Sequence, residues 1–184
     1  MDQHPLPFRI ALVAVARCVV RSAALIGRGA VRQPREAVGR RVTFADGTSA
    51  RIYRETVIGH RPADPCALVV EFRLRGVRGW GHPVFRAESV LNTPLFVGFP
   101  GFVSKWWLAH DENGVYRGFY EWDGPERAAS YARALWWVLM LVCVRSSIRW
   151  VVLPGARRDD LVDAANRFTL TREDDRWRRP VTVA

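Results

Sequence analysis

Apolar residues occupy every second position of one stretch of the chain, residues 67–75. The series Leu68, Val70, Phe72 and Leu74 falls on one side of an extended backbone, and mostly charged residues fall between them. An alternation with a period of two is typical of a β-strand that buries one face. The pattern therefore predicts a strand over residues 67–75.

Turn residues predict two β-hairpins. Asp46-Gly47 separates the apolar runs 42–44 and 50–57, and Asn113-Gly114 separates residues 102–109 from 115–122. Both dipeptides favour the tight turns that join antiparallel strands. In the second hairpin, alternation predicts that Phe102, Trp106 and Leu108 point to one face of the sheet, and that Val103 and Trp107 point to the other. In the same way, it predicts that Phe119 points to one face, and that Tyr120 and Trp122 point to the other.

The remaining patterns complete the order of elements. Pro83 in a first turn predicts a short helix over residues 83–92, and an apolar stripe at helical spacing predicts a longer helix over residues 126–144. Residues 148–153 form a last apolar strand, whereas residues 91–102 are too interrupted by Pro and Gly for regular structure. The order βαββαβ predicts a ferredoxin-like α+β fold, with an antiparallel sheet and both helices on one face.

Both faces of this sheet carry aromatic side chains, so the face without helices also needs a cover. A second copy packed sheet to sheet would give a homodimeric α/β barrel. The hairpin at residues 42–57 or the N-terminal helix could cover the face instead. We expect three parts: an N-terminal helix and linker (1–41), the α+β domain with its extra hairpin (42–155) and a charged tail (156–184).

Residues 8–32 are apolar but contain a row of basic side chains. Arg17, Arg21, Arg28 and Arg32 fall within about 60° of one another on a helix of 100° per residue. The charges inside the apolar run disfavour a membrane-spanning helix, and no small-residue cleavage site indicates a signal peptide. Two alternatives remain: a helix on an anionic membrane surface with its apolar face down, or a helix packed on the domain with the Arg row in water. The second is the more common arrangement.

Composition narrows the class of protein. Of the 184 residues, 49% are hydrophobic and 8 are Trp, which excludes a disordered chain. The net charge of +10 is spread along the chain without a nucleic-acid-binding motif, so we do not expect a nucleic-acid partner. Three scattered cysteines, Cys18, Cys66 and Cys143, fit neither a zinc site nor a disulfide framework and indicate a cytoplasmic protein with reduced thiols.

Lys105 is the main candidate for chemistry, because every other basic residue of the 28 is Arg. A lysine can lose its proton when desolvated, or it can hold an anionic oxygen as a compact cation. If the faces of the second hairpin coincide, Lys105 shares a pocket with Trp107, Tyr120 and Trp122, whose rings suit a flat aromatic ligand. The alternatives are that Lys105 extends to water along its aliphatic stem and that the aromatic residues are ordinary core.

Other polar residues give weaker indications. His82 could act as a general base, although histidines in turns are more often exposed and without a role. Asn92 could bind a substrate oxygen or cap the end of a helix. His110, Asp111 and Glu112 resemble metal ligands, but we expect them to be solvated in a hairpin turn. We predict no metal and no cofactor.

The spacing of several of these residues resembles a known family. Pro100-Gly101-Phe102-x-x-Lys105-x-Trp107, Gly118-x-Tyr120-x-Trp122 and an Ala-x-Tyr131 helix resemble small proteins of the YdhR type, assigned as monooxygenases within the dimeric α/β-barrel superfamily. The likeness covers about residues 67–153 and is sharp over 100–131. It implies a ferredoxin-like subunit, a dimer and a pocket between sheet and helices. Residues 1–66 and the charged tail have no counterpart in it.

These observations predict a protein that binds a small aromatic or hydrophobic molecule. The resemblance adds a possible activity, a cofactor-independent monooxygenase on an aromatic or polyketide-like substrate, with His82 and Lys105 as catalytic residues and Asn92, Trp107, Tyr120 and Trp122 as the substrate site. The alternative is a non-catalytic ligand-binding or adaptor protein, peripheral on the inner face of the membrane through the Arg row.

Overall fold

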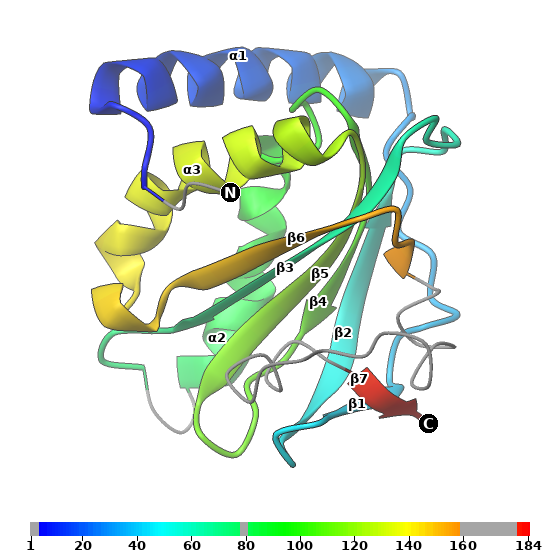
Figure 1. Ribbon diagram of the computed structural model, residues 1–184, viewed down its shortest axis with the longest axis vertical. Helices are drawn as coiled ribbons and strands as arrows, with labels where there is room; N and C mark the ends of the chain where they lie inside the picture. The colour runs from blue at the N-terminus through cyan, green and yellow to red at the C-terminus, as the bar shows by residue number, and fades with distance from the viewer. Residues whose placement is uncertain (1–3, 78–80, 159–179) are drawn as a thin grey trace.

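The computed structural model describes residues 4–77, 81–158 and 180–184, without the side chains of His82, Val84, Phe85 and Glu88. Its seven strands form one curled antiparallel sheet in the order β6-β3-β5-β4-β2-β1-β7 (Figure 1). In chain order they are β1 (Arg41–Phe44), β2 (Ser49–Val57), β3 (Pro65–Arg73), β4 (Phe102–Leu108), β5 (Val115–Asp123), β6 (Arg149–Pro154) and β7 (Pro180–Val183). The predicted α+β class and antiparallel sheet are confirmed.

The helices lie on one side of the sheet. After β3 come α2 (Gly81–Glu88) and a 3-10 helix, η1 (Ser89–Leu95), so the predicted single helix over 83–92 is split and extends into the segment predicted to be irregular. Helix α3 (Pro125–Val142) begins with Pro125 in its first turn, as the sequence predicts. The N-terminal helix α1 (Phe8–Gly27) lies across the outer side of α3 (Figure 1).

Two apolar cores lie on the two faces of the sheet because β3 alternates between them. Leu68 and Val70 face the helices, where they pack with Trp122 and Tyr131. Val69 belongs to the second core, which also contains residues of β1, β2, β4 and β5, among them Val42, Phe44, Ile52, Trp106 and Phe119. A strand that is buried on both faces is expected at the centre of a sheet.

The hairpin β1–β2 covers the second face of the sheet. Strand β2 pairs with β4, and the curl of the sheet brings Phe44 of β1 within 5.8 Å of Phe119, measured between ring centroids. Of the three predicted covers, the hairpin is therefore the observed one, whereas α1 packs against α3 and η1. A sheet-to-sheet contact between two copies is not needed to bury this face.

Strand β4 contains a bulge that changes one predicted face. Phe102 pairs with Trp122 and Ser104 pairs with Glu121, so Val103 is an extra residue on β4. The prediction that Phe102 shares a face with Trp106 is wrong, because the bulge turns Phe102 towards the helices. Strand β7, from the segment predicted to be a charged tail, was not predicted; it pairs with β1 at the edge of the sheet.

Candidate functional site

A cavity of about 780 Å³ lies between the sheet and the segments α2, η1 and α3. Its walls are mostly apolar, with Val70 and Phe72 from β3, Leu95 from η1 and Leu135, Val138 and Leu139 from α3. The exposed side chains Leu91, Leu141 and Val142 also line it, and they mark where it opens to solvent. This size and lining are typical of a site for a small organic molecule.

Lys105 lies at the inner wall of this cavity. It is at the centre of β4, paired with Tyr120 of β5 and Thr56 of β2, and its residue exposure is only 6%. Its Nζ lies 3.1 Å from the ring centroid of Trp107 and 4.6 Å from the centroids of Phe96 and Tyr120. Among the described residues, no hydrogen bond or ion pair reaches this nitrogen. Aromatic faces stabilise the ammonium but do not neutralise it.

A second buried cation, Arg54, contacts the same indole ring as Lys105. The guanidinium carbon of Arg54, on β2, lies 3.9 Å from the ring centroid of Trp107, and its Nη2 donates a hydrogen bond of 2.8 Å to the carbonyl oxygen of Ser89. Its Nε and Nη1 are buried without a hydrogen-bond partner in the described part of the chain. Two buried cations therefore contact one indole ring, and no described carboxylate pairs with either.

Burial is the main cause of the lowered pKa of both cations, Lys105 and Arg54. It lowers the pKa of Lys105 well below its ordinary value, and the nearby positive charge of Arg54 lowers it further. The pKa of Arg54 is also lowered by burial. A lysine in this condition can accept a proton from an acidic O–H or C–H group and then hold the resulting anion as an ammonium ion.

Two tyrosine hydroxyls also belong to the polar part of the wall. Tyr131 Oη donates a hydrogen bond of 3.2 Å to Tyr120 Oη, and both residues line the cavity. Burial raises the pKa of both phenols, so both are neutral at physiological pH. Because Tyr120 accepts this bond, its own hydrogen is available to donate to a ligand oxygen.

The structure brings together four of the six residues predicted for this site. Lys105, Trp107 and Tyr120 line the cavity, because the faces of β4 and β5 coincide as the pocket hypothesis requires, and half-buried Asn92 lines it from η1. Trp122 does not line it: the ring is fully buried, with its centroid 5.6 Å from Phe102 and 4.8 Å from Tyr131. The backbone of His82 lies in α2, but its side chain lies outside the described residues.

Sequence reasoning missed two residues that line the cavity, Phe96 and Tyr131, and the cation beside it, Arg54. Arg54 reaches the site only because β2 pairs with β4, a pairing between distant segments that no local pattern predicts. Phe96 lies in the segment predicted to be irregular. Tyr131 could have been found, since it belongs to the apolar stripe of the predicted second helix and to the Ala-x-Tyr motif.

The other polar candidates have structural roles. Asp111 was predicted to be solvated, but it is buried, and its carboxylate accepts hydrogen bonds from the backbone of Asn113 and Val115 and from Arg117. The carboxylate of Glu112 accepts two hydrogen bonds from Ser49. Its pKa is lowered to about 2 by a hydrogen bond from its own backbone and by the two from Ser49. No group of three potential metal ligands occurs among the described residues. The three cysteines are buried and free.

The predicted Arg row is only partly helical. Arg17 and Arg21 are exposed on α1, Arg28 is at its C-terminal cap, and Arg32 lies beyond the helix, where its backbone pairs with Val57 of β2. The prediction of one helical row of four is therefore wrong for Arg32, because the helix ends at Gly27. Within the described residues, α1 is the one helix long and apolar enough to cross a membrane by length and composition, and 17% of its most apolar window is buried.

No protein-family model, curated protein or solved structure matches this chain. The resemblance to the YdhR type stays a prediction carried by residues 100–131.

Proposed function

We propose that this protein binds a small, mostly apolar molecule with one anionic or acidic oxygen, and that Lys105 holds that oxygen. The observation that carries the proposal is the ammonium nitrogen of Lys105 at the wall of an apolar cavity, without a hydrogen-bond or ion-pair partner among the described residues. An uncompensated buried charge is costly, so proteins retain one where a ligand or a reaction uses it. Arg54 is a second source of positive potential behind Trp107.

The geometry supports phenols, enols and carboxylic acids as ligand classes. As an ammonium ion, Lys105 can pair with a ligand that enters as an anion. Because its pKa is lowered, its neutral form can instead take the proton of a phenol or enol, and the resulting ammonium and phenoxide or enolate form the same ion pair inside the cavity. The hydroxyl of Tyr120 is placed to donate a further hydrogen bond to the same oxygen. The flat rings of Phe96 and Trp107 provide stacking surface for an aromatic ligand body.

A cofactor-independent monooxygenase would use the same complex. The bound anion is electron-rich, and the apolar walls exclude water while dioxygen reacts with it. With dioxygen as the oxidant, a methylene group becomes a carbonyl: one oxygen atom enters the substrate and the other leaves as water, so no further reductant is required. An oxygen electrode tests this step with anthrone, whose methylene is acidic because its anion is a phenolate.

The fold proposal is a ferredoxin-like unit enlarged by three strands. The partial order β6-β3-β5-β4, with helical segments after β3 and after β5, supports it. A homodimer and a cytoplasmic location are parts of the same proposal, and the three free thiols support the location. The cavity is formed within one chain, so ligand binding does not depend on the dimer.

Native mass spectrometry of the purified protein tests the proposal and the dimer together. We expect the wild-type chain to carry an added mass of a few hundred daltons, the size of molecule that such cavities hold. The Lys105→Met variant should lack it while keeping its circular dichroism spectrum. A bare wild-type chain, or an adduct that Lys105→Met retains, would contradict the assignment of Lys105.

A further inference from the structure

Helix α1 contacts the domain through a narrow stripe of small residues. Ser22 Oγ donates a hydrogen bond of 2.8 Å to the carbonyl oxygen of Pro94 and accepts one of 2.8 Å from the backbone nitrogen of Gly98. A Cβ atom on Gly98 would lie 2.1 Å from the carbonyl oxygen of Cys18, so the helix and this loop are in direct backbone contact. The inner side of α1 is therefore fixed to the fold and runs along the surface of the domain.

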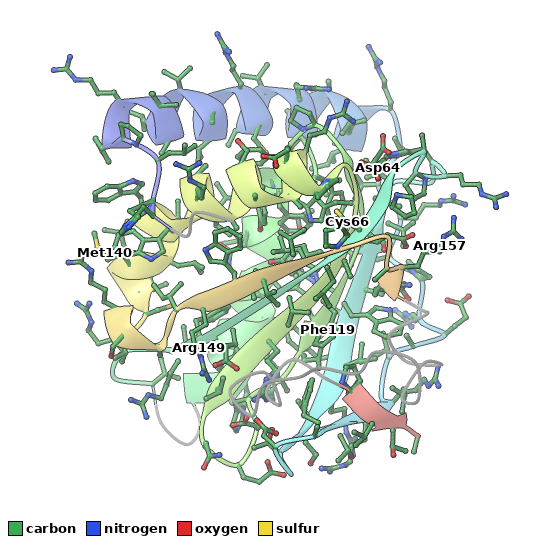
Figure 2. All side chains as sticks on the ribbon, in the orientation of Figure 1. Asp64, Cys66, Phe119, Met140, Arg149 and Arg157 are labelled. Atoms are coloured by element: carbon green, nitrogen blue, oxygen red, sulfur yellow. The ribbon has the colours of Figure 1, made fainter. Side chains whose placement is uncertain are left out.

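The outer side of α1 carries apolar side chains that are exposed to water, with the exposed Arg9 among them. We define the outer face of α1 as its exposed large apolar residues Ile10, Leu12, Val13, Val19, Val20 and Ile26, which are 39–71% exposed. Side chains project outward along the whole length of this helix, several with basic ends (Figure 2). Several large apolar side chains exposed along one helix are unusual for a soluble surface and mark a site of interaction.

Basic side chains accompany this face. Arg17 and Arg21 are exposed on one flank of the helix, and Arg28 follows at its end. No acidic residue occurs between Asp2 and Glu36, so the charge of the whole segment is positive. Arg17 and Arg21 also border a groove of about 620 Å³ between α1 and Phe99.

We propose that the outer face of α1 docks in the plane of an anionic lipid bilayer, with its apolar side chains among the acyl chains and Arg17 and Arg21 at the lipid phosphates. Long basic side chains beside a buried apolar face are the usual arrangement of interfacial helices. A second copy of this chain fits less well, because a symmetric contact would bring the same Arg residues together. Spanning is disfavoured, because it would break the contacts of Ser22 and Gly98 with each other.

Vesicle flotation of the full-length protein tests this proposal. We expect binding to vesicles of phosphatidylcholine with one quarter phosphatidylglycerol, and at least about tenfold weaker binding to phosphatidylcholine alone. Val13→Asp with Val20→Asp should abolish binding to both. Arg17→Gln with Arg21→Gln should weaken binding to the anionic vesicles by about 25-fold, from about fivefold per basic residue.

Matched controls separate this surface from charge in general. Arg51→Gln with Arg73→Gln removes two exposed charges from the sheet and should reduce binding much less than the α1 pair. Circular dichroism should be unchanged in every variant. Binding that survives Val13→Asp with Val20→Asp, or equal losses from the two Arg pairs, would overturn the proposal.

Two further results would also overturn it. Protein that resists extraction from vesicles by alkaline carbonate would show that α1 spans the bilayer. A lipid-free dimer that Val13→Asp with Val20→Asp converts to a monomer would assign the outer face to a second copy.

Discussion

Two buried cations on the same hairpin have opposite surroundings. Arg117 of β5 is 4% exposed and has three carboxylates around it: Asp111 at 2.7 Å, with Glu71 and Asp46 at 3.3 Å. Lys105 of β4 is nearly as buried, yet its nitrogen meets aromatic rings and the cavity, without a carboxylate among the described residues.

The difference separates a buried charge that is paired within the described part of the chain from one that is not. The carboxylates around Arg117 compensate its desolvation, so this charge contributes to folding and to the second core of the sheet. Among the described residues the charge of Lys105 meets only aromatic faces, so the folded state bears the cost of burying it, and we propose that a bound anion offsets this cost. Arg158 follows the pattern of Arg117, since Glu55 pairs with it at 2.7 Å.

The largest expected effect follows from removing each charge in turn. Arg117→Met should lower the free energy of unfolding by about 3–5 kcal/mol, because it leaves the buried carboxylate of Asp111 without its cation. Lys105→Met should raise it by about 1 kcal/mol, since an uncompensated charge is replaced by an apolar chain of similar length. Urea unfolding followed by tryptophan fluorescence measures both. Equal destabilisation by the two substitutions would remove the contrast between them.

A smaller effect is expected at Gly118, which pairs with Trp107 across the hairpin. A Cβ at this position would lie 2.7 Å from Cε2 of Tyr120, so Gly118→Ala should displace the tyrosine ring and destabilise the fold by about 1–3 kcal/mol. Gly27→Ala is the control, because its Cβ would meet nothing within 4 Å. We expect the control to change stability by less than about 0.5 kcal/mol. Similar losses for both variants would show that the site tolerates movement of Tyr120.

The smallest effect is the dependence of stability on pH. Lys105 has a lowered pKa when folded and about 10.4 when unfolded, so between these values the unfolded chain binds more protons and the free energy of unfolding rises with pH. Lys105→Met lacks this contribution. Its stability advantage of about 1 kcal/mol over the wild-type chain should shrink towards zero as the pH rises towards 10. An advantage that is constant across this range would contradict the lowered pKa.

The sequence predicted the site wherever local patterns determine geometry. Alternation within β4 places Lys105 on the same face as Trp107, whereas the sequence left open whether Tyr120 shares that face; the pairing of Lys105 with Tyr120 answers this. The same reasoning failed for Phe102, because a bulge shifts the alternation by one residue and the sequence carries no clear signal for it.

The features that the sequence did not predict depend on contacts between segments far apart in the chain. Arg54 enters the site through the contact of β2 with β4, and Asp111 is buried because the turn folds back on Arg117. Neither contact leaves a periodic signal in the chain. The sequence predicted an apolar helix with a row of Arg residues, but it did not predict which side of the helix packs on the domain. The hydrogen bond from Ser22 to Pro94 shows which side faces inward.

The most direct test of the role proposed for Lys105 compares the binding of two ligands to two proteins. Isothermal titration calorimetry would compare 2-naphthoate with the neutral 2-naphthamide on the wild-type chain and on Lys105→Met. The account predicts that the substitution weakens binding of the carboxylate by at least about tenfold, as expected for a charged hydrogen bond, and leaves that of the amide nearly unchanged. Equal affinities of the carboxylate for the two proteins, or equal losses for both ligands, would show that Lys105 does not recognise an anionic oxygen.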